Sequence, residues 1–177
     1  VTADPARTGM VVTAFLLASL AVLTLAAYAN SLHGSFIFDD DQIVLQNPQL
    51  INIHSISDVA GLAGSWRQLL FLTYGANYYW SGLDTYSYHA VNVALHLINV
   101  ILIYFIILDI AGPSDGSYTA FCGAAVFGVH TLFSGAVSYI AGRSSVLCAV
   151  FYFLTVLLFL KAMKQNVGPT QRAALMV

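Results

Sequence analysis

Three adjacent carboxylates are the side chains of this sequence best suited to do chemistry. Asp39, Asp40 and Asp41 close the segment at residues 34–41 (GSFIFDDD), which follows a long apolar run. Carboxylates are costly near lipid, so a cluster at a membrane edge predicts a functional site. A carboxylate there could act as a general base on a hydroxyl group. Crowding of like charges should also raise the pKa of at least one of the three.

A divalent cation is an alternative ligand for Asp39, Asp40 and Asp41, because Mg²⁺ and Ca²⁺ prefer oxygen ligands. Adjacent side chains cannot all converge on one ion without other ligands, so the sequence predicts no dedicated metal site. We expect no required cofactor. The net charge of −2 shows no excess of basic residues that could bind phosphates, so no nucleic-acid partner is expected.

A second apolar run carries four polar residues spaced by three, four and three: His89, Asn92, His96 and Asn99. This spacing places them on one helical face. Because unpaired polar groups are costly in lipid, that face should look into protein or into a water-filled cavity open to the outside. Interhelical hydrogen bonding is the alternative use of the amides. His96 could also bind a tetrapyrrole axially, but no second pattern accompanies it, and we do not expect that contact.

The glycine-punctuated run at residues 128–143 is unusual for a simple span. It predicts a helix that breaks near His130 and is followed by a short re-entrant segment. Non-helical backbone at membrane depth must be buried in protein or line a water-filled cavity. Ala141, Gly142 and Arg143 then form a tight external turn. We expect Arg143 at the outer surface, where its planar fork could clamp a phosphate, or where it could snorkel or pair with an Asp.

The composition indicates the elements that position these residues. The chain is 59% hydrophobic and 8% charged, which is typical of an integral membrane protein. Four runs are long enough to cross a bilayer, at about residues 10–29, 89–108, 118–139 and 144–160. The predicted fold is an all-α integral membrane protein, a single membrane domain over residues 1–177. Its four transmembrane helices are joined in part by a long external loop, about residues 30–88.

The flanking charges predict the orientation. Basic residues flank the first span and the end of the fourth: Arg7, Lys161, Lys164 and Arg172. Both termini should therefore be cytoplasmic, in a cell (inner) membrane.

Within the external loop, Ser57 and Asp58 predict the start of a helix reaching about Phe71. An aromatic stretch at residues 73–88 predicts an interfacial cap, or a lining for a sugar or lipid headgroup. The sequence begins with Val1 and ends like a connector, so we expect a fragment of a longer protein.

The residues that carry a family resemblance lie in order along the chain: Gly34, Phe36, Ile37, Phe38, Asp39 and Asp40, then Asn47, Pro48, Arg67, Asn77 and Tyr78, then Tyr88, His89, Val91, Asn92, Leu95, His96 and Asn99, and last His130, Ala136, Val137, Tyr139, Ile140, Ala141, Gly142 and Arg143. This set resembles the N-terminal membrane region of the transmembrane and tetratricopeptide-repeat O-mannosyltransferases and their bacterial homologues. That family has the multi-span glycosyltransferase-C fold.

The resemblance implies sugar transfer from a polyprenyl-phosphate carrier to a hydroxyl group of a protein acceptor, with an external Asp as general base. Asp39 and Asp40 match the family's acidic pair. The basic positions and cavity-side histidines are matched by Arg67, Arg143, His89 and His130, and we add His96 as a further substrate- or phosphate-binding candidate because it shares the polar stripe. Besides the lipid bilayer, the implied partners are the polyprenyl-phosphate sugar and the acceptor protein.

Departures from the family pattern keep a second hypothesis open. Phe133 replaces a second histidine and Gly135 replaces a glutamate, while Gln68 stands in place of a proline and Ser145 in place of an acidic residue. The alternative is a non-catalytic four-span accessory subunit derived from the same fold and packed against other membrane subunits, for example in a photosynthetic or respiratory complex.

Overall fold

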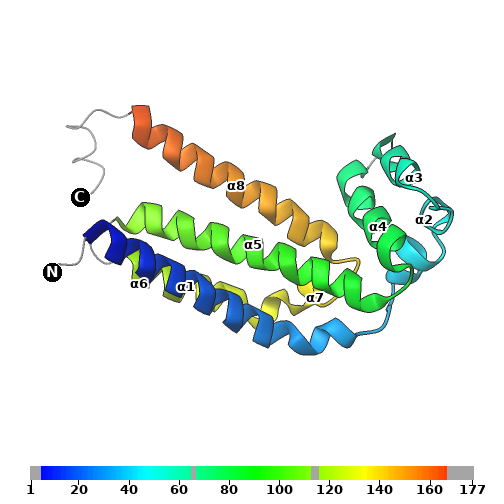
Figure 1. The fold of residues 1–177 in the computed structure, drawn as a ribbon, viewed down its shortest axis with the longest axis horizontal. Helices are drawn as coiled ribbons and strands as arrows, with labels where there is room; N and C mark the ends of the chain where they lie inside the picture. Colours follow the sequence, from blue (N-terminus) through cyan, green and yellow to red (C-terminus); the bar gives the residue numbers. More distant parts are fainter. Residues whose placement is uncertain (1–4, 65–66, 113–115, 167–177) are drawn as a thin grey trace. The chain divides into compact units, whose positions relative to one another are not determined.

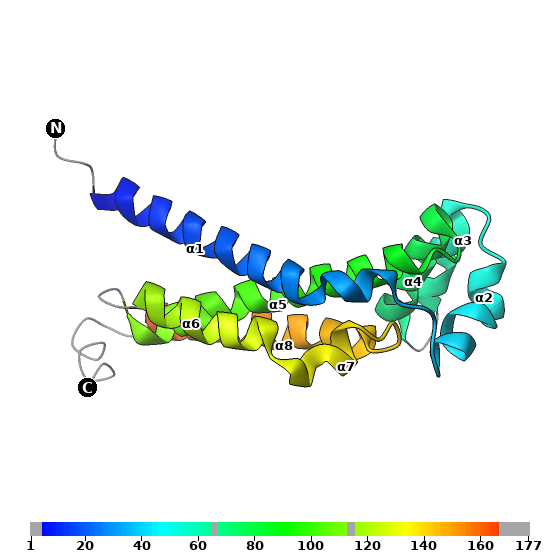
Figure 2. The same cartoon turned by 90° about the horizontal axis from the view of Figure 1, so that it is seen from below.

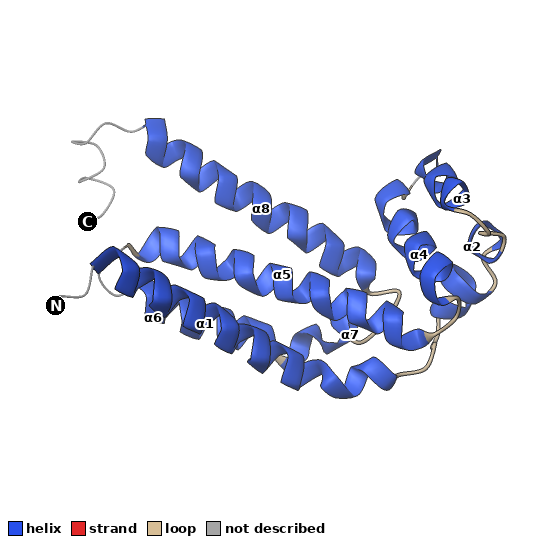
Figure 3. Cartoon of the chain, viewed as in Figure 1, coloured by secondary structure: helices blue, strands red, loops and turns tan. Residues whose placement is uncertain are grey.

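Every regular element that the structure describes is a helix. The computed structural model describes residues 5–64, 67–112 and 116–166, and no strand occurs in these ranges (Figure 3). Long helices are α1 (Pro5–Tyr28), α5 (Thr85–Ala111) and α8 (Arg143–Asn166). The predicted all-α membrane protein is therefore confirmed, as expected where apolar segments must satisfy their own backbone hydrogen bonds.

Three stretches are long and apolar enough to cross a membrane: Arg7–His33, Thr85–Ala111 and Arg143–Lys164. A fourth is a bent pair, formed by α6 (Gly116–Val129) and the segment Thr131–Val137, with a 46° bend. That segment comprises η4 (Thr131–Phe133) and α7 (Ser134–Val137). Counted as one span, the bent pair gives the four spans predicted. The bend falls at His130, whose backbone is extended and whose Nδ1 accepts a hydrogen bond from the Leu132 N–H.

The chain divides into two compact units, and each of the long helices contributes residues to both. The first unit comprises residues 1–24, 97–129 and 149–177, and the second comprises residues 25–96 and 130–148. In the first unit α5 and α6 run side by side and α1 is inclined to them (Figures 1 and 2), around a buried core of Leu16, Leu20, Val100, Tyr104, Ala120 and Ala124. Small residues on α6 let the helices approach closely, as is common between membrane helices.

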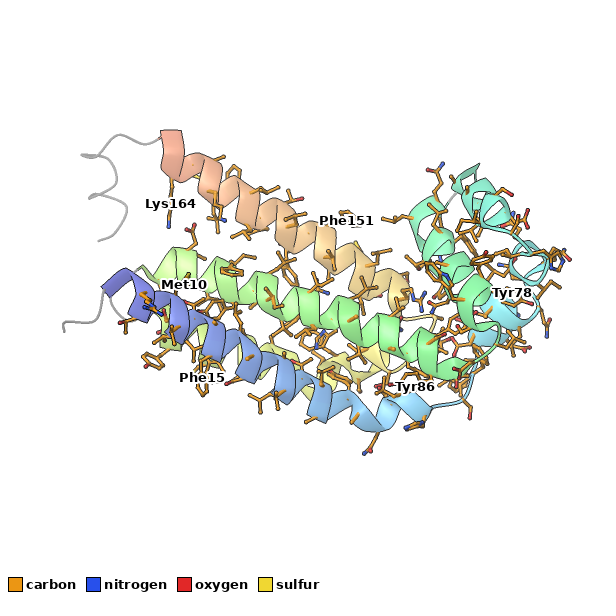
Figure 4. All side chains as sticks on the ribbon, viewed as in Figure 1. Met10, Phe15, Tyr78, Tyr86, Phe151 and Lys164 are labelled. Carbon is orange, nitrogen blue, oxygen red and sulfur yellow. The ribbon has the colours of Figure 1, made fainter. Side chains whose placement is uncertain are left out.

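The outer surface of the first unit is apolar. Met10, Phe15 and Phe151, labelled in Figure 4, are exposed, as suits helices whose surroundings are lipid. Where the apolar stretch of α5 ends, Lys164 of α8 pairs with the carboxylate of Asp109 at 2.9 Å. This pair is partly exposed, so we expect it to contribute little to stability.

The predicted external loop is almost wholly folded within the second unit. It contains η1 (Ala29–His33), the π-helical turn η2 (Asp41–Leu45), α2 (Pro48–Ile51), α3 (Ile56–Gly61), η3 (Leu62–Gly64) and α4 (Gln68–Ser81) (Figure 1). These short helices pack around a buried core of Val44, Leu50, Ile53, Val59, Leu62, Leu70, Tyr74, Tyr88 and Ile140. The loop therefore folds around an apolar core, to which Ile140 from the later part of the chain also contributes.

The predicted helix from Ser57 to about Phe71 is wrong in both its start and its length. The cap is Ser55, whose hydroxyl accepts from the Asp58 N–H while the Asp58 carboxylate accepts from the Ser55 N–H. This reciprocal pair forms a capping box, and α3 ends at Gly61. Val59 on α3 and Leu70 on α4 both belong to the buried core of the second unit.

Candidate functional site

The acidic segment begins at a glycine that a histidine ring covers. His89, on the first turns of α5, is buried, and its Nε2 donates to the Gly34 carbonyl at 3.2 Å. A Cβ atom at Gly34 would lie 3.0 Å from that Nε2 and 3.2 Å from the Ser31 carbonyl oxygen. The absence of a side chain therefore lets the loop pass close to the ring, and the hydrogen bond fixes the start of residues 34–41.

Asp40 is an internal anchor of the acidic segment. Its side chain is completely buried, and its two carboxylate oxygens accept from the N–H groups of Ile37 at 3.0 Å and Ala141 at 2.8 Å. The first bond closes a local turn, and the second ties the segment to the chain a hundred residues later. Charge-assisted bonds of this kind are among the stronger hydrogen bonds in proteins, so Asp40 joins two segments.

Asp39 has the opposite environment. Its side chain is exposed, while its backbone N–H donates to the Tyr139 hydroxyl at 2.9 Å. Asp41 is also exposed, but Gln46 Nε2 donates to its carboxylate at 2.6 Å. Among the three carboxylates, Asp39 thus combines an accessible side chain with a backbone fixed from outside the segment.

Burial raises the pKa of the Asp40 carboxyl above its ordinary value. The N–H groups of Ile37 and Ala141 and the nearby His89 oppose that rise, and repulsion from Asp39 adds only a minor part. A raised pKa in the cluster was predicted from crowding of like charges. The rise is found, but its main cause is desolvation.

Arg143 lies at the centre of a buried polar network. Its side chain has no solvent exposure, so the guanidinium is enclosed by protein and is not free to clamp a phosphate. Its expected position at the outer side of the membrane stays a prediction. Its guanidinium donates to Asn92 Oδ1 and Asn77 Oδ1 at 2.8 Å each, to Thr73 Oγ1 at 3.2 Å and to the Tyr88 carbonyl at 3.0 Å.

Aromatic rings replace a carboxylate as the charge partner of Arg143. The guanidinium carbon lies 4.3 Å from the centroid of the Tyr74 ring and 5.7 Å from that of Tyr88. Such cation–π contacts gain strength when desolvated. No carboxylate in the described ranges forms an ion pair with Arg143. Neutral oxygens and ring faces together therefore hold the buried cation.

The turn between Tyr139 and Arg143 connects this network to the acidic segment. Asn92 Nδ2 donates to the Tyr139 carbonyl at 2.9 Å, and the Tyr74 hydroxyl donates to the Ile140 carbonyl at 2.9 Å. Burial raises the pKa of Tyr74 to about 12, so this hydroxyl keeps its proton. The turn is therefore held by the network through its carbonyls and bound to Asp40 through the Ala141 N–H.

Gly142 is required by a close approach of two backbones. A Cβ atom there would overlap the carbonyl group of Ala136. Each of the three residues at 141–143 thus has a structural role. Ala141 donates its N–H to Asp40, Gly142 lacks the Cβ that would overlap Ala136, and Arg143 supplies the cation of the network. The predicted tight turn into the fourth span is confirmed.

The remaining predicted residues do not converge with the acidic pair. His96 is buried between the rings of Tyr28, at 5.2 Å, and Phe133, at 6.1 Å. His130 is exposed and caps η4. Arg67 is exposed at the N-terminus of α4. The polar stripe of α5 thus faces protein, with Asn92 acting through hydrogen bonds as the alternative prediction proposed.

The sequence alone indicated no role for Tyr139. It also did not distinguish buried from exposed rings in the aromatic stretch at residues 73–88. Tyr139 appeared in the quoted motif without a role, and only its contact with the Asp39 N–H reveals one. Within the aromatic stretch, Tyr74 and Tyr88 are buried around Arg143, whereas Trp80 and Tyr86 are exposed; Tyr86 is labelled in Figure 4. No spacing in the sequence separates the buried rings from the exposed ones, because Tyr74 and Tyr88 lie on two different helices, α4 and α5.

The described residues contain no group of three or more His, Cys, Asp or Glu side chains able to hold a metal ion. Asp40 turns inward while Asp39 and Asp41 stay exposed, so the geometry lends no support to a divalent cation at the triplet. That alternative stays a prediction.

Comparison with known proteins identifies protein O-mannosyl-transferases among the relatives of this chain. The chain is 32% identical to protein O-mannosyl-transferase tmtc2 of Xenopus laevis over 151 residues, covering 78% of this chain and 18% of that protein. It is 28% identical to protein O-mannosyl-transferase Tmtc1 of Drosophila melanogaster, covering 83% of this chain and 18% of that protein. It is also 28% identical to protein O-mannosyl-transferase TMTC4 of Mus musculus, covering 81% and 22%.

The chain therefore spans about a fifth of the length of the curated relatives it matches. No established family profile matches it, and no solved structure matches it either.

Proposed function

Because the chain belongs to the TMTC family of protein O-mannosyl-transferases, we propose that it carries the general base of a membrane glycosyltransferase. The observation that carries this proposal is the environment of Asp39. Its carboxylate is exposed, and its backbone is held by Tyr139 on a turn that Asp40 anchors. A base must reach a proton on the substrate, and its position must be fixed.

The proposed step is the transfer of a sugar, mannose as in the relatives' names, from a polyprenyl-phosphate carrier to an acceptor hydroxyl. Asp39 accepts the hydroxyl proton while the oxygen attacks the anomeric carbon. The bond from that carbon to the phosphate oxygen breaks, and the polyprenyl phosphate leaves with the electron pair. The configuration at the anomeric carbon inverts. We propose that this takes place at the external face of the cell membrane, in a glycosyltransferase-C fold.

The acidic pair then has two different roles. Asp40 is buried and both of its carboxylate oxygens accept backbone hydrogen bonds, so an acceptor cannot contact it in this arrangement. Its role is to position the turn. Arg143 is likewise a positioning residue, because its donors are used within the protein. The leaving phosphate needs cationic stabilisation, and Arg67, which is exposed, is the candidate in this unit.

The non-catalytic alternative is favoured by one specific observation. His89, His96 and Arg143, three of the predicted phosphate-binding residues, are buried against protein groups. A subunit that only packs in a larger membrane complex would retain such a network for stability. A glycosyltransferase requires the Asp39 carboxylate, whereas a subunit that only packs does not. This carboxylate is exposed and is not one of the groups that bind the Arg143 guanidinium.

The experiment compares two neutralised carboxylates in the full-length protein. Transfer of mannose from polyprenyl-phosphate mannose to a threonine peptide is measured for wild type, Asp39→Asn and Asp41→Asn. Loss of a general base should lower the rate of Asp39→Asn by about 10²–10⁴-fold. Asp41→Asn removes the same charge from a nearby position, and it should stay within about threefold of wild type, since a surface substitution of this kind changes little.

Wild-type activity with an unchanged Asp39→Asn rate would remove Asp39 from the mechanism. Absence of transfer by the wild-type protein, under conditions where a relative is active, would favour the structural subunit.

A further inference from the structure

Phe38 adopts a backbone conformation that side chains rarely adopt. Its φ is +48°, in the left-handed region, and it is the one residue other than glycine with positive φ in the described ranges. A bulky residue there is an outlier. Strained positions of this kind persist where the surroundings hold them, and they gather at functional sites.

The surrounding bonds explain how the conformation is held. The Asp40 N–H donates to the Ile37 carbonyl at 3.0 Å, and the Asp41 N–H donates to the Phe38 carbonyl at 3.3 Å. Both of these bonds use the backbone, so a glycine at position 38 would make them without steric strain. The bonds therefore explain the turn but not the choice of phenylalanine.

Packing does not explain that choice either. The Phe38 side chain is 86% exposed, so it gains little from burial within the described part of the chain. Ile37, next to it, is 47% exposed. The two side chains form an apolar pair directly before the exposed carboxylate of Asp39. A strained backbone that presents an apolar ring beside the candidate base indicates a ring used in binding.

We propose that Phe38 contacts the acceptor polypeptide and selects acceptors with an apolar side chain next to the hydroxyl-bearing residue. This inference rests on the proposed function, because it assumes that the acceptor hydroxyl reaches Asp39. The backbone hydrogen bonds of the turn hold Phe38 directly before Asp39 in the chain. An apolar neighbour of the reacting residue would lie against the ring while the hydroxyl contacts Asp39.

Two other occupants fit the charges less well. In an inverting transfer the donor phosphate leaves on the side of the anomeric carbon opposite to the attacking hydroxyl, and the exposed carboxylates of Asp39 and Asp41 next to Phe38 repel an anion. Insertion of Phe38 into lipid would bring the same carboxylates toward hydrocarbon, which is costly. A neutral polypeptide segment meets neither penalty, and burial of the ring against an apolar side chain is favourable.

The experiment measures acceptor preference in the full-length protein. Two peptides are compared, one with leucine and one with serine next to the same threonine, at saturating donor. Wild type should prefer the leucine peptide by about tenfold in kcat/KM, the discrimination that a modest apolar contact provides. Phe38→Asn should bring the ratio close to one and leave the KM for the donor unchanged. Asparagine tolerates the left-handed conformation, so this variant should fold with an unchanged or higher melting temperature.

The matched control is Trp80→Asn, which removes an aromatic ring that is 76% exposed on α4; its peptide ratio should equal that of wild type. A Phe38→Asn enzyme that keeps the full preference would overturn the inference and leave the proposed function standing. An equal loss of rate with both peptides would also overturn it, since that result would indicate a role in folding or membrane contact. Absence of transfer by wild type would overturn the proposed function and this inference together.

Discussion

At the scale of single residues, two adjacent aspartates have opposite environments. Asp40 is buried and accepts two backbone hydrogen bonds, whereas the Asp39 side chain is exposed. The sequence predicts the acidic pair but cannot separate its members, because the separating partner, Ala141, lies a hundred residues away. The same holds for Arg143, whose charge suggested a surface position while its partners on α4 and α5 bury it.

The raised pKa of Asp40 predicts a pH-dependent stability. The folded protein binds this proton more tightly than the unfolded chain, so the free energy of unfolding should fall as the pH rises from the ordinary aspartate pKa of about 3.9 through the raised value. Above that value the contribution should be constant. Asp39 and His89 are the charged or titratable neighbours that influence it.

The measurement is the melting temperature against pH for wild type and Asp40→Asn, with the difference between the two curves isolating this group. An asparagine amide can accept hydrogen bonds through only one oxygen, so the variant should be less stable by about 1–3 kcal/mol at neutral pH, and the gap should widen toward acid. Parallel curves would contradict the assigned pKa direction.

At the scale of elements, the turn between α7 and α8 joins the buried network to the acidic segment. Turn chemistry is readable from the sequence, and the tight turn at residues 141–143 and the break at His130 were both predicted correctly. The cap of α3 at Ser55 was not predicted. Ser55 and Ser57 are both residues that can cap a helix, they lie two positions apart, and the sequence alone does not rank them.

Gly142→Ala should destabilise the protein strongly. The added Cβ would overlap the Ala136 carbonyl, and the contact is with backbone, so relief requires moving the turn itself; overpacking of this kind costs about 1–3 kcal/mol or more. The matched control is Gly135→Ala on α7, where a Cβ would meet no atom within 4 Å. Thermal unfolding should show a lower melting temperature for Gly142→Ala alone, and equal effects of the two substitutions would contradict the close approach.

Arg143→Lys should also be destabilising although it keeps the charge. A lysine cannot reproduce the planar fork or its stacking on Tyr74, so Asn92, Asn77 or the Tyr88 carbonyl would lose a donor at about 1–3 kcal/mol for each group left unpaired. Arg67→Lys, at an exposed position, should change stability by less than about 0.5 kcal/mol. Chemical denaturation of both variants checks this, and a fully stable Arg143→Lys protein would show that the network tolerates a point charge.

At the scale of the whole molecule, composition alone predicted a helical membrane protein, because an apolar chain in lipid has few other ways to satisfy its backbone. The spans were close to those found. The division into two compact units was not predicted, since it depends on which part of each long helix packs with the loop. The single membrane domain, the orientation and the cell membrane stay predictions.

Cysteine accessibility tests that orientation. In a protein with Cys122 and Cys148 replaced by alanine, a cysteine is introduced at Ser57 or at Lys161, which are both exposed. A membrane-impermeant maleimide should label Ser57→Cys in intact cells and Lys161→Cys only after permeabilisation. Labelling of both from outside would refute cytoplasmic termini.

The central claim is that Asp39 does the chemistry while Asp40 positions it. The most direct test is the single-turnover rate of mannose transfer, measured beside the melting temperature, for Asp39→Asn and Asp40→Asn in the full-length protein. We predict that Asp39→Asn loses about 10²–10⁴-fold in rate at an unchanged melting temperature, and that Asp40→Asn melts earlier. The claim would be contradicted by an Asp39→Asn protein that transfers sugar at the wild-type rate.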